Sequence, residues 1–86
     1  MLRLILERDG YRVEQWGDAP GMIFPQYKHP KLQSHWVVSG GLEFTVNGEV
    51  FTLEAGDRSF LDPETYHSMR VTSEEEFTIY LVGAKI

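Results

Sequence analysis

The sequence predicts one small all-β domain, and three observations support this prediction. Polar and apolar residues alternate through most of the chain, the alternating segments are short and roughly evenly spaced, and turn-forming residues separate them. This pattern is typical of a β-sandwich or β-barrel. No stretch repeats apolar residues at the spacing of an amphipathic helix. A chain of 86 residues is expected to form a single domain, residues 1–86, and it contains no linker or internal repeat.

The expected elements follow in order along the chain. Residues 4–8 and 11–16 flank Asp9-Gly10, a pair suited to a two-residue turn, so an amino-terminal hairpin is expected. Extended chain at 22–29 contains Pro25, which indicates an edge position or a bulge. Asn47-Gly48 is the strongest turn signal present. The remaining strands are expected at residues 33–39, 42–46, 49–53, 58–61, 67–71 and 77–82.

The composition argues against several kinds of partner and site. The chain has 8 basic and 13 acidic side chains, a net charge of −5, and its basic residues are scattered, so nucleic acid is not expected as a partner. Without cysteine there is neither a disulfide framework nor cysteine catalysis, and a cytoplasmic protein is expected. The apolar segment 2–8 is too short and too charged for a membrane span or a signal sequence.

Polar side chains that could bind a metal recur on the predicted strands. Side chains two apart on a strand share a face, so Tyr27 lies with His29, and Gln33 lies with His35. His67 opens a later strand. If these strands line one barrel, an imidazole pair, a phenol and an amide converge, which is a plausible set of metal ligands.

The spacing of these residues resembles that of the cupin family. Its first motif is matched in register by Gly21, the segment Tyr27-Lys28-His29, Gln33 and Gly40, and its second by the segment from Gly56-Asp57 to His67. The resemblance covers roughly residues 21–71. It implies a jelly-roll β-barrel, in which residues 1–20 form an amino-terminal arm and residues 72–86 the closing strand.

The resemblance also implies a ligand set, with departures from the family pattern. His29 and His67 stand at ligand histidines, whereas Tyr27 replaces a histidine and Gln33 replaces a glutamate. Glu64 and Val71 replace a glycine and an asparagine of the second motif. His29 and His67 would hold the ion, and Tyr27 or Gln33 would complete the site. Iron is the first expectation, with zinc, nickel and manganese open. The alternative is a set of hydrogen-bonded histidines in a barrel without metal.

His35 has three possible roles: a fourth ligand, a general acid or base, or a hydrogen-bond partner of a substrate. The alternative is a buried structural histidine. Phe44 and Met69 are expected to line the cavity. Three further phenylalanines are expected to be barrel lining or core: Phe51, Phe60 and Phe77.

Two functions remain open at this point. One is a metal-binding cupin that acts on a small organic molecule, by dioxygenase-like or isomerase-like chemistry. The other is a non-catalytic binder or sensor of a small molecule with a degenerate metal site. A weaker third option is a relative of the sensing half of a transcription regulator, without DNA binding of its own.

A homodimer is the expected assembly. A chain this short buries only about 60% of the surface that it exposes when unfolded, so a partner subunit or a metal would add stability. Trp36 points away from the predicted pocket, and aromatic residues are enriched at interfaces. The alternative is that the chain's own amino-terminal segment covers Trp36.

Overall fold

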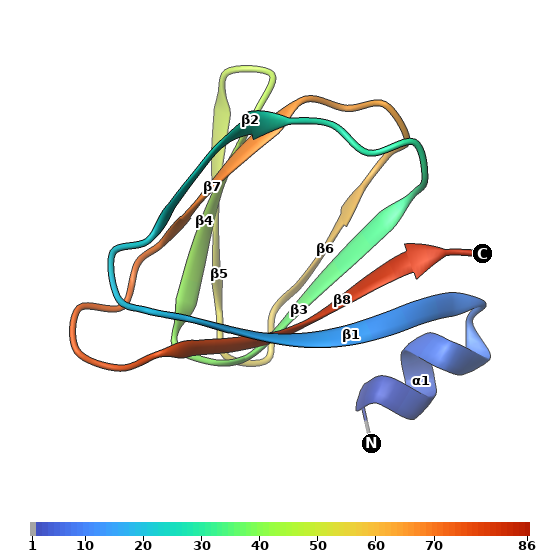
Figure 1. The fold of residues 1–86 in the computed structure, drawn as a ribbon, viewed down its shortest axis with the longest axis horizontal. Coiled ribbons are helices and arrows are strands. Elements are labelled where there is room, and N and C mark those ends of the chain that lie inside the picture. Colours follow the sequence, from blue (N-terminus) through green and yellow to red (C-terminus); the bar gives the residue numbers. More distant parts are fainter. Residues whose placement is uncertain (1) are drawn as a thin grey trace.

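The computed structural model describes residues 2–86, apart from the side chain of Tyr27. One short helix precedes eight strands (Figure 1). Their bounds are α1 (Leu2–Arg8), β1 (Tyr11–Asp18), β2 (Ile23–Tyr27), β3 (Gln33–Ser39), β4 (Gly41–Val46), β5 (Glu49–Glu54), β6 (Arg58–Leu61), β7 (His67–Val71) and β8 (Thr78–Lys85).

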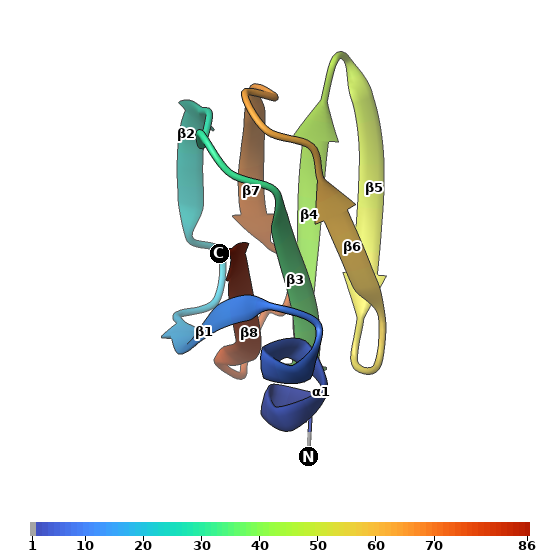
Figure 2. The same cartoon turned by 90° about the vertical axis from the view of Figure 1, so that its right-hand side faces the viewer.

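The strands form two four-stranded antiparallel sheets that face each other. The first has the order β1-β8-β3-β6 and the second the order β2-β7-β4-β5, and Figure 2 shows the second with its strands side by side. Their facing side chains form one apolar core, as the alternating sequence pattern predicts. The all-β jelly-roll prediction is therefore confirmed. The core consists of Val37, Leu42, Phe44, Leu53, Leu61, Met69, Val71 and Tyr80.

The predicted amino-terminal hairpin is wrong, because residues 2–8 form the helix α1. Leu6 is fully buried, whereas Leu4 and Ile5 are exposed, so the helix buries only a narrow apolar stripe. Asp9 and Gly10 are not a hairpin turn. Their amide groups donate to the last helical carbonyls, and Gly10 has a φ of 88°, as is usual where a helix ends.

Helix α1 covers the outer face of the first sheet, on the side away from the second sheet (Figure 1). Leu6, Tyr11, Val13 and Leu81 form a second buried cluster there, and Trp36 packs against it. The Trp36 ring also contacts the Arg58 guanidinium, 4.9 Å from the ring centre. Trp36 thus has partners within its own chain, and the homodimer stays a prediction.

The four phenylalanines expected in the interior differ in position. Phe44 is buried in the core, but Phe51, Phe60 and Phe77 are exposed, which corrects the expectation for these three. Phe60 lies on an edge strand and packs against Arg58, whose guanidinium is 4.4 Å from the ring centre. Alternation alone places a side chain on a face, but burial also depends on whether a neighbouring strand covers that face.

In the part of the chain that the structure describes, no helix is long and apolar enough to cross a bilayer.

Candidate functional site

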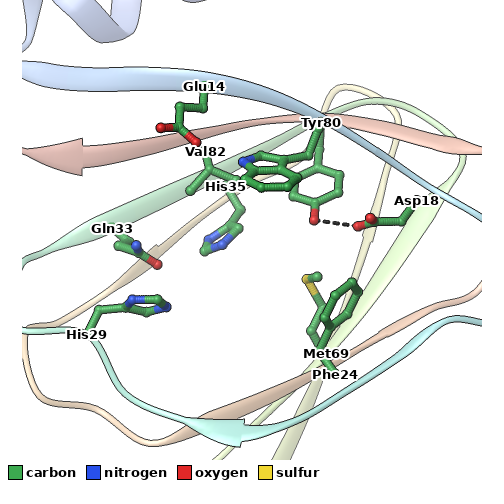
Figure 3. Close-up of a pocket in the computed structure, with 10 residues that line it drawn as sticks. Glu14, Asp18, Phe24, His29, Gln33, His35, Met69, Tyr80 and Val82 are labelled. Carbon is green, nitrogen blue, oxygen red and sulfur yellow. Dashed lines mark hydrogen bonds between the residues drawn. The ribbon is translucent and has the colours of Figure 1, made fainter.

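A cavity of about 330 Å³ opens between the two sheets, on the side where β1 and β2 are the edge strands (Figure 3). Its wall combines carboxylate, imidazole, amide, aromatic and aliphatic groups. The lining residues are Glu14, Trp16, Asp18, Phe24, His29, Gln33, His35, Met69, Tyr80 and Val82.

His29 reaches this cavity from the connection between β2 and β3. The expectation that it shares a strand face with Tyr27 is wrong, because β2 ends at Tyr27. The turn before β7 fixes the connection instead: the Glu64 amide donates to the His29 carbonyl at 2.7 Å, and the Glu64 carboxylate pairs with Lys28 at 3.1 Å. Burial, and secondarily the proximity of His67, lowers the pKa of His29.

His67 opens β7 as expected, and its side chain is buried. Its Nδ1 donates to the Thr65 carbonyl at 3.3 Å, which leaves Nε2 as the lone-pair nitrogen of the neutral ring. The ring centre lies 5.3 Å from that of His29, and the two planes are inclined by 33°. Burial lowers the pKa of His67, against a smaller opposite effect of the Thr65 carbonyl.

Gln33 and His35 face the cavity from β3, as their shared parity predicts (Figure 3). They are 9% and 3% exposed. Burial, with smaller contributions from His67 and His29, lowers the pKa of His35 to about 3, so the ring is neutral near pH 7. Gln33 Oε1 and His35 Nδ1 have no hydrogen-bond partner among the described residues. The side chains that carry these two buried atoms line the cavity.

The three other predicted site residues, Met69, Phe44 and Tyr27, differ in their position relative to the cavity. Met69 lines the cavity. Phe44 does not: it packs behind the histidines, with its ring centre 4.9 Å from that of His35 and 6.1 Å from that of His67. The Tyr27 backbone pairs with His67 across β2 and β7, but its side chain lies outside the described residues.

One complete wall of the cavity was not predicted from the sequence. Tyr80 donates a hydrogen bond of 2.5 Å to Asp18 Oδ2, which joins β8 to the end of β1. Glu14 and Trp16 line the same wall, together with Asp18. The signal for this wall is present in the sequence, because residues 14, 16 and 18 alternate on one strand. This alternation identifies the wall only when it is known which face of β1 points into the cavity. The incorrectly predicted hairpin did not provide that information.

The geometry of the histidines decides how they fit a metal. With a metal–nitrogen bond of about 2.1 Å and roughly 1 Å from nitrogen to ring centre, two imidazoles on one tetrahedral ion would have centres about 5 Å apart. The rings of His29 and His67 fit this distance, whereas His35 and His67, at 6.3 Å, exceed it. Within the described residues, no group of three or more His, Cys, Asp or Glu side chains is arranged to hold a metal. A metal site would therefore also need the Tyr27 or Gln33 side chain.

Comparisons with known proteins agree with this fold. A profile of the cupin domain matches residues 16–83. None of the curated proteins shows significant similarity to the chain. Among solved structures, the cupin domain of Cnp3 from Schizosaccharomyces pombe superposes with a TM-score of 0.76 at 18% identity, covering 90% of this chain. This chain spans only 54% of the Cnp3 chain's length.

Two bacterial structures are similar over more of their own length. The cupin domain of an XRE family transcriptional regulator from Enterobacter cloacae has a TM-score of 0.75 and 19% identity, with 93% of this chain and 85% of that chain covered. An uncharacterised conserved protein from Klebsiella pneumoniae with a double-stranded β-helix domain has 29% identity and a TM-score of 0.72, with 88% and 67% covered. Because the profile matches most of the sequence, the chain belongs to the cupin domain family.

Proposed function

We propose that this cupin binds a small organic molecule in the cavity between its sheets. The observation that supports the proposal is that Gln33 and His35, whose side chains line that cavity, each carry a buried polar atom without a hydrogen-bond partner among the described residues, Gln33 Oε1 and His35 Nδ1. A buried polar group without a hydrogen bond costs about 1–3 kcal/mol, so a ligand that supplies the missing partners would be stabilised at this point. The volume of about 330 Å³ lies at the lower end of small-molecule sites.

The chemistry of His35 favours hydrogen bonding over proton transfer. A general base works best when its pKa lies near the working pH, and the pKa of His35 is lowered to about 3. A neutral His35 ring would orient a ligand through one nitrogen. This supports the binding or sensing alternative more than a catalytic role for His35.

A variant pair tests the binding function. Gln33→Leu keeps much of the volume of the side chain and removes its amide, whereas Gln15→Leu makes the same change at an exposed position outside the cavity. A library of small organic compounds would be screened by ligand-observed NMR. Compounds that bind the parent chain should lose affinity with Gln33→Leu and keep it with Gln15→Leu. A screen without hits, or hits indifferent to Gln33→Leu, would contradict the proposal.

A metal at the edge of this cavity, between His29, which lines it, and His67, which does not, is the second candidate function, and the distance of 5.3 Å between the two rings favours it. These two neutral imidazoles would hold the ion, with Tyr27 or Gln33 completing the site. Iron is the first expectation, with zinc, nickel and manganese open, because imidazole ligands suit all of these ions. When bound, the ion would act as a Lewis acid toward an oxygen of the ligand.

Metal analysis of the purified chain tests this second candidate. A transition metal at one equivalent per chain, lost in His67→Ala, would support it. The Gln15→Leu variant is the control, because Gln15 is exposed and lies outside the cavity. A chain that carries no metal and takes none up on titration would leave only the metal-free binder.

A further inference from the structure

The wall that β1 contributes has a distinctive charge pattern. Glu14, Trp16 and Asp18 alternate along the strand and all line the cavity, so an indole ring lies between two carboxylates. Figure 3 shows Glu14 and Asp18 at opposite ends of this wall. No lysine or arginine is among the lining residues. Glu14 and Asp18 also form no ion pair with another described residue.

The inner end of the cavity adds a hydrogen-bond acceptor and no lysine or arginine. Gln33 Oε1 is an acceptor that lacks a donor among the described residues. The imidazoles of His29 and His35 line the same space. A ligand that donates a hydrogen bond there would satisfy the Gln33 oxygen. A carboxylate or phosphate ligand would meet two carboxylates and no cation.

Aromatic side chains complete the pattern. Trp16, Phe24 and Tyr80 line the cavity. The face of an aromatic ring attracts a cation, most strongly for tryptophan. Carboxylates beside such rings favour an ammonium group further through charge-assisted hydrogen bonds, and here Glu14 is exposed and Trp16 is 50% exposed, at the open side of the cavity.

We propose that the cavity selects organic cations, namely a primary ammonium group on an apolar or aromatic body, in preference to anions of the same size. The ammonium group would lie by Trp16 between Glu14 and Asp18, and the body would extend along Phe24, Met69 and Val82. This inference rests on the proposed small-molecule function and does not require the metal.

Three probes of similar shape and different charge test the inference. These are 2-phenylethylamine as the cation, 2-phenylethanol as the neutral analogue and phenylacetate as the anion, each titrated calorimetrically into the full chain. The amine should bind about tenfold more tightly than phenylacetate, because the indole ring and the two carboxylates attract the amine and the same carboxylates repel the anion.

The double variant Glu14→Gln/Asp18→Asn should remove most of this preference while leaving binding of 2-phenylethanol unchanged. Asp18→Asn keeps an oxygen that can accept the Tyr80 hydrogen bond, so the fold is preserved. The double variant Glu49→Gln/Glu75→Gln is the control. It removes the same charge from exposed positions outside the cavity, and the preference should persist there.

The outcomes separate the two proposals. If phenylacetate binds as tightly as the amine, or if the amine binds the double variant as tightly as the parent, the cation inference is overturned. Binding of 2-phenylethanol in that case would leave the small-molecule function intact. If none of the probes binds at millimolar concentration, the cation inference is overturned, and the screen with Gln33→Leu alone decides the small-molecule function.

Discussion

The imidazole rings of His29 and His67 lie 5.3 Å apart, although one comes from the connection after β2 and the other from the start of β7. Strand pairing explains this contact, because Tyr27, at the end of β2, is the register partner of His67. Two residues further along the chain, the His29 ring lies beside that of His67. The cluster is thus a consequence of an edge pairing in the second sheet, to which β3 adds His35 from the first.

Acid should destabilise the fold through its histidines. In the unfolded chain His35 has a pKa of 6.5, and in the folded chain burial lowers this to about 3. The folded chain therefore favours the neutral ring. This stability is complete above pH 6.5 and is lost as the pH falls from 6.5 toward 3. Each histidine that must protonate contributes a slope of about 1.4 kcal/mol per pH unit.

Urea unfolding of the metal-free chain between pH 6.5 and 5, above the range in which most carboxylates titrate, measures this slope. His35→Gln should reduce it by about one proton's contribution and leave a residual slope from His29 and His67, whose pKa values are also lowered. An unchanged slope in His35→Gln would contradict the burial of a neutral His35 ring.

Gly40 should tolerate alanine far less well than Gly48. Both have left-handed φ values, 83° and 80°, so either substitution adds backbone strain of about 1–2 kcal/mol. At Gly40 a Cβ would also lie 2.8 Å from the Thr78 Cα, whereas at Gly48 nothing lies within 4 Å. Thermal unfolding should therefore show a loss for Gly40→Ala at least about 2 kcal/mol greater than for Gly48→Ala. Equal losses would mean that β3 and β8 do not approach this closely.

Leu6 and Leu4 separate the helix from the hairpin that the sequence pattern suggests. In helix α1, Leu6 is 0% exposed and Leu4 is 57% exposed. Leu6→Ala should cost about 2–5 kcal/mol of unfolding free energy, and Leu4→Ala less than about 0.5 kcal/mol. In a strand these two positions would share a face, so similar losses for both variants in urea denaturation would favour the hairpin.

The homodimer is open to direct measurement. Static light scattering at micromolar concentration should give about twice the chain mass of 9.9 kDa. The outer face of the first sheet beyond α1 would form the contact, because Val38 and Phe60 are exposed there beside Trp36. Val38→Lys should then give monomers. A monomer mass for the parent chain would end the dimer prediction.

The strands could be predicted from the sequence with good accuracy. One face of each sheet is buried, and the alternation of polar and apolar residues indicates which face that is. Residues 33–39, 58–61 and 67–71 have the bounds that the sequence predicts. The helix could not be predicted this way. Its segment Leu4-Ile5-Leu6 is apolar throughout, and only packing on the outer face of the first sheet determines that Leu6 alone of the three is buried.

The site was predictable in part for a similar reason. The histidines occupy positions that resemble a family motif, so they could be named from the sequence. Asp18 and Tyr80 belong to no such motif, and their contact arises only when β1 pairs with β8. Long-range pairing of this kind leaves no local signal, because both residues are ordinary in their own strands.

NMR of the histidine rings tests most directly whether the cavity lined by His29 and His35 binds small organic molecules. The ring Cε1 resonances would be assigned with His29→Gln, His35→Gln and His67→Gln and followed during titration with 2-phenylethanol. Binding in the cavity should give saturable shifts of the His29 and His35 resonances at one ligand per chain. Resonances that stay fixed while signals elsewhere in the chain move would contradict it.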